Sequence, residues 1–177
     1  MVWQYVLTAI SFVLYFGFVI LGVCKFGLLS CYSAYGPKWQ PDRSSKINWW
    51  QIITCVTALL IVPVLLECSE GNPYQFLGFL APASLLLVGA TPDYQTNNFS
   101  MILHQIGAWS AVVFITAYSI LIPNLWWVVA ILVAISIVLG IIKKGTFMFW
   151  AEMAMYLSTF IIVFLLIGGK VGMQVLR

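Results

Sequence analysis

The sequence predicts an all-α membrane protein, a bundle of about six transmembrane helices forming one domain over residues 1–177. Two observations lead to this fold class. Of the 177 residues, 63% are hydrophobic and 7% are charged, whereas about a quarter of the residues in a soluble domain are charged. The apolar runs are also continuous rather than alternating, which favours helices over the strands of a membrane barrel.

Each apolar run is measured against the roughly 17–25 residues that a membrane-spanning helix needs. We predict spans at about these residues: 2–24, 49–66, 76–90, 100–122, 125–142 and 147–167. The first run lacks the basic start and the cleavage site of a signal peptide, so we expect a retained helix. The third run is short, and its Pro82 removes a backbone hydrogen bond and frees the Gly78 carbonyl. Such a break often lines a cavity, which makes Pro82 a secondary site candidate.

The charged residues between the runs predict the orientation. Two predicted loops hold six basic residues: Lys25, Lys38, Arg43, Lys46, Lys143 and Lys144. Glu67 and Glu70 lie in the loop between the second and third runs, which has no Lys or Arg. The positive-inside rule therefore places the basic loops in the cytoplasm and both termini on the outer face of the cell membrane. Lys170 and Arg177 oppose this orientation, but they are two against six.

Three ionisable residues are predicted to meet near the inner leaflet. Asp93 ends the third span, while His104 and Glu152 each lie about 9 Å inside their own spans, at 1.5 Å per residue. Ionisable groups within a span usually face the bundle interior and pair with another group. We therefore name Asp93, His104 and Glu152 as candidates for a ligand or proton site. Polar residues near the inner end of the first span, and one that shares a helix face with Glu152, are expected close by: Ser30, Tyr32, Ser33 and Tyr156.

The helical face of His104 supports an inward placement. Gly107, Ala108 and Ala111 follow it at helical spacing, and small residues let a neighbouring helix approach closely. The opposite face carries apolar residues suited to lipid: Ile102, Ile106, Trp109 and Val113. Three interpretations stay open for His104 and Glu152. They form a structural hydrogen bond between helices, they form a substrate, ion or proton site, or they reach the interface without a partner.

Other candidate chemistry is weaker. Glu67 and Glu70 share a helix face, as paired acid and base residues do, but their position at a span end favours a solvated helix terminus, so they are secondary candidates. The single histidine excludes a bis-histidine haem site. The four cysteines form no CxxC pair, so we expect no metal or other cofactor. No basic nucleic-acid patch is present, and we expect the lipid bilayer to be the main partner.

Several segments resemble a group of uncharacterised small six-span bacterial membrane proteins. The matching pieces are 63–67 (PVLLE), 87–94 (LVGATPDY) and His104 with the small residues behind it. They correspond to the PAxLE-like, FVGAAPxF-like and VH-like motifs of that group. Residues 30–35 (SCYSAY) resemble its Ser/Tyr-rich end of span one. The resemblance implies a six-helix bundle and no particular activity.

Three hypotheses for the function follow, in order of rank. The first is a small transporter, channel or ligand-binding membrane protein with a polar site at the inner leaflet. The second is an accessory or oligomerising protein that interacts with copies of itself or with another membrane protein. The third is a lipid-acting enzyme using His104 with Asp93 or Glu152 as acid and base. No credible nucleophile accompanies these residues, which favours a protein that is not an enzyme, and no catalytic residue is assigned.

Overall fold

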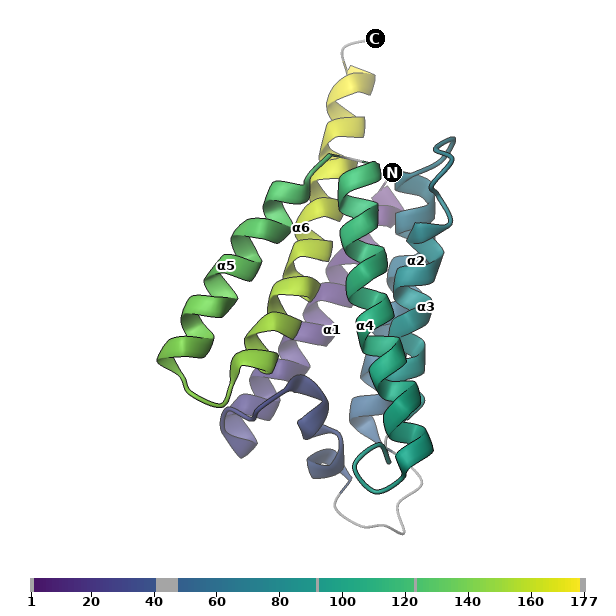
Figure 1. Ribbon diagram of the computed structural model, residues 1–177. Coiled ribbons are helices and arrows are strands. Elements are labelled where there is room, and N and C mark those ends of the chain that lie inside the picture. The colour runs from purple at the N-terminus through teal and green to yellow at the C-terminus, as the bar shows by residue number, and fades with distance from the viewer. Residues whose placement is uncertain (1, 41–47, 92, 123, 176–177) are drawn as a thin grey trace.

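The computed structural model describes residues 2–40, 48–91, 93–122 and 124–175, with side chains as far as residue 169. The described residues form helices and no strand (Figure 1). The six α-helices are α1 (Val2–Phe26), α2 (Trp49–Cys68), α3 (Leu77–Gly89), α4 (Asn98–Leu121), α5 (Trp126–Ile142) and α6 (Phe147–Val175). Two short 3-10 helices, η1 (Tyr32–Tyr35) and η2 (Pro37–Trp39), follow α1. The predicted all-α bundle is confirmed.

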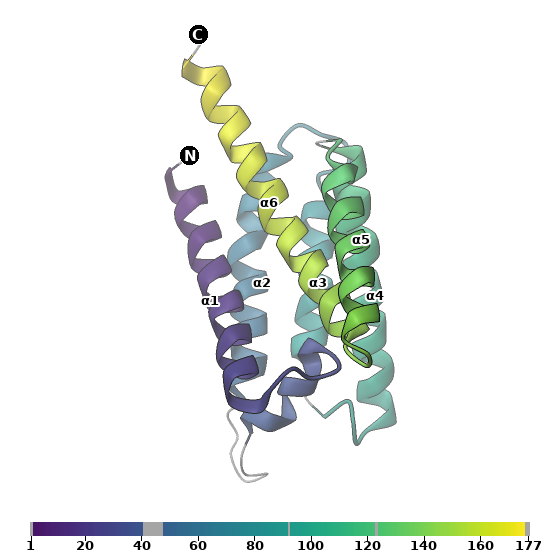
Figure 2. The ribbon, with the colours of Figure 1, turned by 90° about the vertical axis from the view of Figure 1, so that its left-hand side faces the viewer.

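The helices run up and down, so that successive connections alternate between the two ends of the bundle (Figures 1 and 2). Both termini lie at one end, called here the upper end. The lower end carries η1, η2, the α3–α4 turn and the α5–α6 turn. The basic residues Lys38 and Lys144 therefore lie at the end opposite Glu67 and Glu70, as the sequence predicts. Four basic residues of that prediction lie outside the described residues or side chains: Arg43, Lys46, Lys170 and Arg177.

Asparagine side chains fix where two of the helices begin. The Asn48 Oδ1 accepts hydrogen bonds from the backbone N–H groups of Trp50 at 3.1 Å and Gln51 at 3.4 Å, which starts α2. Asn97 caps α4 in the same way, with Phe99 N at 2.9 Å and Ser100 N at 3.4 Å. An oxygen at this position satisfies N–H groups that have no partner within the helix. The cap explains why α4 begins two residues before the predicted position.

Within the described ranges, four helices are long and apolar enough to cross a membrane: α1, α2, α4 and residues 147–169 of α6. Helix α3 has 13 residues and α5 has 17, which give lengths of about 20 Å and 26 Å. The hydrocarbon core of a bilayer is about 30 Å thick. The structure therefore supports four spans by length, whereas the sequence predicts six. Helix α3 continues through Pro82, which is buried, so the proline does not end the helix.

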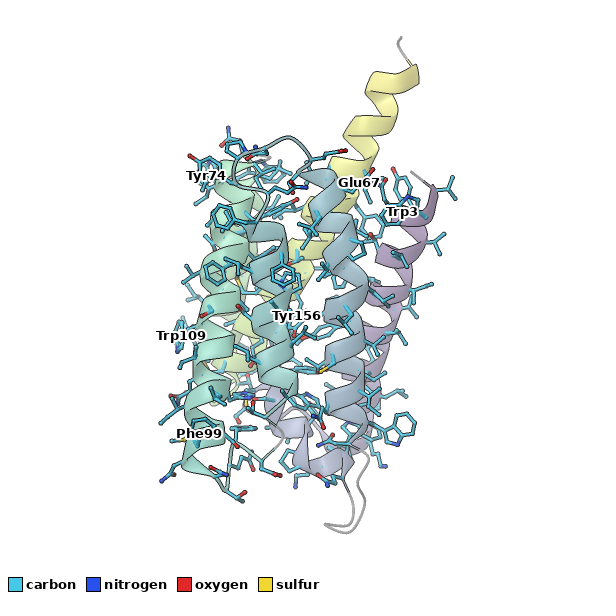
Figure 3. The ribbon with its side chains drawn as sticks, turned by 90° about the vertical axis from the view of Figure 1, so that its right-hand side faces the viewer. Trp3, Glu67, Tyr74, Phe99, Trp109 and Tyr156 are labelled. Atoms are coloured by element: carbon cyan, nitrogen blue, oxygen red, sulfur yellow. The ribbon has the colours of Figure 1, made fainter. Side chains whose placement is uncertain are left out.

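The predicted inner and outer faces of α4 are confirmed. His104, Gly107 and Ala111 are buried, while the four residues predicted to face lipid are all more than half exposed: Ile102, Ile106, Trp109 and Val113. Figure 3 shows Trp109 pointing away from the bundle. A Cβ atom at Gly107 would lie 2.8 Å from the Ser84 carbonyl oxygen of α3. The absence of a side chain at this glycine therefore sets how closely α3 and α4 pack.

This packing predicts a difference between two glycine substitutions. We expect Gly107→Ala to lower the free energy of unfolding by about 1–3 kcal/mol, because the added methyl group meets backbone atoms of α3. Gly17→Ala in α1 is the matched control, since nothing lies within 4 Å of its Cβ position. Alanine should leave stability unchanged or raise it by up to about 1 kcal/mol there. Unfolding by sodium dodecyl sulfate in mixed micelles measures both, and equal effects would contradict the close packing of α3 on α4.

Candidate functional site

Glu152 connects α6 to the segment that follows α1. It lies in the second turn of α6, and its Oε2 accepts a hydrogen bond from the backbone N–H of Tyr32 at 2.5 Å. A second bond, from Phe149 N to the Ser30 carbonyl oxygen at 2.9 Å, joins the same two segments. The N–H of Tyr32 begins η1, where it has no partner within the short helix. Glu152 therefore holds residues 30–32 beneath the bundle.

Three tyrosines surround the Glu152 carboxylate, and we call Tyr15, Tyr32 and Tyr156 the tyrosine cluster. Tyr156 lies one turn beyond Glu152, on the same face of α6. Its ring stacks on that of Tyr15, with centroids 3.7 Å apart and planes at 20°. The Tyr15 and Tyr32 rings are 4.9 Å apart. Figure 3 shows Tyr156 within the bundle, behind α2 and α3. The carboxylate therefore lies among aromatic rings from α1, η1 and α6.

The phenol of Tyr32 stays protonated. Burial raises its pKa above the ordinary value and the nearby Glu152 charge raises it further, while a hydrogen bond with Thr54 partly opposes this. The Tyr32 Oη and the Thr54 Oγ1 are 3.2 Å apart. This bond fixes the Tyr32 ring against α2. Glu152, rather than the Tyr32 phenol, is therefore the acidic group of this region.

Two buried polar atoms of the residues around the tyrosine cluster lack a hydrogen bond of normal geometry among the described residues, the Tyr15 Oη and the Trp50 Nε1, and both side chains are fully buried. The Tyr15 hydroxyl still interacts with that of Tyr156. The Trp50 ring lies 5.7 Å from that of Tyr32. Most buried polar groups in proteins are hydrogen-bonded, so a buried polar atom without a hydrogen bond is a candidate for binding a water molecule, an ion or a ligand. Glu152 and Tyr156 are half-buried as whole residues.

His104 has a different set of contacts. Its Nδ1 lies 3.2 Å from the Thr91 Oγ1, and that hydroxyl also lies 3.0 Å from the carbonyl oxygens of Leu87 and Val88 at the end of α3. The hydroxyl has one hydrogen, which is directed to a carbonyl, so we assign the neutral imidazole as the donor through Nδ1. His104 therefore joins the end of α3 to the first turns of α4.

Tyr94 extends this connection to η1. Its ring stacks on His104, with centroids 4.1 Å apart and planes at 12°, and its hydroxyl accepts a hydrogen bond from the Gln95 Nε2 at 3.0 Å. Burial raises the pKa of Tyr94, and hydrogen bonding with Ser33 and Gln95 partly opposes the increase. Ser33 belongs to η1, so the α3–α4 turn packs against the same segment that Glu152 holds.

The structure does not assemble the predicted trio of Asp93, His104 and Glu152. Asp93 is exposed, and its carbonyl oxygen accepts the N–H groups that close the α3–α4 turn. His104 and Glu152 lie at the same end of the bundle but have different partners, Thr91 and the Tyr32 backbone. Glu152 accepts the Tyr32 N–H, and among the described residues no hydrogen bond joins it to the His104 imidazole. The Trp50 ring forms an indirect connection between the two residues. Its centroid lies 6.4 Å from that of the His104 ring and 5.7 Å from that of Tyr32, whose backbone N–H binds Glu152.

The secondary candidates are apart from this site. Glu67 and Glu70 are exposed at the upper end, where Figure 3 shows Glu67. Pro82 is buried within α3. Among the described residues, no three His, Cys, Asp or Glu side chains lie together as metal ligands would. The sequence analysis missed Tyr15 altogether. Its signal was a tyrosine in the middle of an apolar run, one of several polar residues on the buried face of α1 that also includes Gln4, Thr8 and Ser11.

These separate partners predict additive effects for His104→Leu and Glu152→Leu. We expect the double variant to lose the sum of the single losses in unfolding free energy to within about 0.5 kcal/mol, because no contact joins the two residues. The pair Thr91→Val and His104→Leu is the positive control, with a coupling of about 1 kcal/mol through their shared hydrogen bond. Unfolding in mixed micelles measures both cycles. A strong coupling in unfolding free energy between His104 and Glu152 would contradict their separate partners and support the direct pair that the sequence predicts.

No protein-family model, curated protein or solved structure matches this chain. The resemblance to small six-span bacterial membrane proteins therefore stays a prediction from its motifs. The function has to be inferred from the geometry at the lower end of the bundle, where a carboxylate inside the helices is enclosed by tyrosines.

Proposed function

We propose that the chain is an integral membrane protein of the transporter or ligand-binding class, and that it binds a small organic cation at Glu152. The exposed surface supports a membrane location. Large apolar side chains are exposed along α1, α4 and α5, including Val13 at 66% and Ile141 at 70%. Soluble proteins rarely expose apolar surface on this scale. Exposed tryptophans near the helix ends, such as Trp3, Trp49 and Trp126, suit the two membrane interfaces.

In this proposal the lower end faces the cytoplasm. Lys25, Lys38, Lys143 and Lys144 are exposed there, and cytoplasmic segments carry an excess of basic residues. All six helices cross the bilayer, with α3 and α5 completed by the turns that flank them. Glu152 then lies close to the inner leaflet.

The observation that carries the proposal is a carboxylate among aromatic rings with a polar atom left unpartnered beside it. A charged group within a membrane-spanning bundle needs a partner. The backbone N–H of Tyr32 gives Glu152 a hydrogen bond but no opposite charge. A cation supplies the missing charge. Ring faces of the cluster that lie outside the Tyr15–Tyr156 stack attract cations as well. The Tyr15 Oη, which lies beside the Tyr156 hydroxyl, has a lone pair that can accept a hydrogen bond from an ammonium N–H, so we expect primary amines to bind more tightly than quaternary ones.

The proposed cation site is tested by ligand binding to the full chain in nanodiscs. Methylammonium chloride is the main probe, tetramethylammonium chloride is the probe without an N–H donor, and sodium chloride is the ionic-strength control. We expect Glu152→Gln to weaken the binding of both ammonium ions at least about tenfold, because it removes the charge but keeps an acceptor for Tyr32 N. Calorimetric titration measures the affinities, and thermal unfolding without ligand confirms that the variant remains folded.

Two further variants make the test specific. Tyr15→Phe should weaken methylammonium binding about fivefold, the worth of one hydrogen bond, and leave tetramethylammonium binding unchanged. Asp93→Asn removes an exposed carboxylate at the same end of the bundle and should change neither affinity. If Asp93→Asn acts like Glu152→Gln, the ions bind by general electrostatics. If the parent protein binds neither ammonium ion, Glu152 serves to hold η1, and the interaction-protein hypothesis takes precedence.

A further inference from the structure

A second feature of the bundle is an apolar groove on the side away from α3 and α4. It encloses about 410 Å³ between α1, α5 and α6, within the range of about 300–1,000 Å³ that is typical of ligand sites. Its lining is almost entirely hydrocarbon and includes Val19, Val23, Leu132, Leu139, Phe149 and Met153. The Ser136 hydroxyl, which also lines it, donates to the Val133 carbonyl oxygen at 2.8 Å. The groove therefore suits an apolar occupant.

The α5–α6 turn places positive charge at the lower end of this groove. Lys143 follows Leu139 by one helical turn, and its N–H donates to the Leu139 carbonyl oxygen at 2.8 Å. Lys143 and Lys144 are both exposed. Figure 2 shows α6 between α1 and α5, with the segment after α1 crossing below towards the start of α6. That segment contributes Leu28 to the lining. Among the described residues, the turn from 143 to 146 contains no acidic side chain.

We propose that the groove binds one acyl chain of an anionic phospholipid, whose phosphate contacts Lys143 and Lys144. The lipid belongs to the leaflet at the lower end of the bundle. The apolar lining recognises the chain, and the two ammonium groups select an anionic headgroup over a zwitterionic one. This inference rests on the membrane location in the proposed function, but it is independent of the ligand at Glu152.

Lys25 provides a comparison at the same end of the bundle. Its Nζ lies 4.8 Å from the Trp39 ring centroid and 5.2 Å from that of Phe26, so the ammonium group is already engaged by aromatic rings. Helical geometry also places Lys25 on the face of α1 opposite Val23 and Ile20, which line the groove. Lys25 should therefore not contribute to the lipid site, although it is a lysine at a similar depth.

The test is photo-crosslinking in phosphatidylcholine vesicles that contain a trace of diazirine-tailed phosphatidylglycerol or diazirine-tailed phosphatidylcholine. We expect the anionic probe to label peptides from α1 and α5 that line the groove in preference to the outer face of α4. Lys143→Gln and Lys144→Gln should each reduce this preference about fivefold, while Lys25→Gln should not change it. Mass spectrometry of the labelled peptides gives the preference. Methylammonium chloride should leave the labelling unchanged relative to sodium chloride at equal ionic strength, which separates this site from the proposed cation site.

Two tryptophan variants test the groove itself. Ile135→Trp places a large ring in the lining, whereas Ile137→Trp adds the same ring on another face of α5. Both isoleucines are exposed to similar extents, 48% and 43%, so neither change should prevent folding. We expect only Ile135→Trp to reduce labelling of the groove by phosphatidylglycerol. Equal labelling by the two probes, or equal effects of the two variants, would overturn the proposal.

Discussion

The hydrogen bond from the Tyr32 backbone to Glu152 is the interaction on which the lower half of the bundle depends. It brings the segment after α1 across to α6, and this places the Tyr32 ring against Tyr15 and Trp50. The same segment also packs closely against α1, since a Cβ atom at Gly22 would lie 2.9 Å from the Tyr35 ring. One acidic side chain thus satisfies a backbone donor at the start of η1 and places a carboxyl group beside the tyrosine rings.

In the upper half of the bundle several polar side chains donate to backbone carbonyl oxygens, whereas the buried Gln4 Oε1 has no hydrogen-bond partner among the described residues. The Tyr118 hydroxyl of α4 donates to the Leu65 carbonyl oxygen of α2 at 3.1 Å, and the Gln75 side chain donates to that of Leu66 at 2.8 Å. Ser69 also donates to the Leu65 carbonyl oxygen, at 2.7 Å. Bundles in an apolar medium are expected to satisfy polar groups internally in this way. The lower half differs in having an acidic side chain, Glu152, beside the tyrosine cluster.

The sequence predicted the helices and their buried faces well, and it predicted the site only in part. Apolar periodicity is a local property, so the inward face of α4 with His104 and Gly107 was readable from spacing alone. The partner of Glu152 was not readable, because a backbone N–H exists at every residue and only the path of the chain decides which one reaches the carboxylate. The position of Tyr32 near the inner end of α1 was anticipated. Its neighbour Tyr15 was missed, because a tyrosine inside an apolar run gives no sign of the rings it will meet.

The state of the Glu152 carboxyl group is the most direct test of the central claim. The chain contains three glutamates, so ¹³C-glutamate labelling in an otherwise functional Glu67→Gln and Glu70→Gln background leaves Glu152 as the single reporter. The account predicts that its carboxyl signal in solid-state nuclear magnetic resonance shifts as methylammonium is added, and that sodium at equal ionic strength does not move it. A signal that stays fixed while methylammonium saturates the protein would show that the cation binds elsewhere, and would contradict Glu152 as its site.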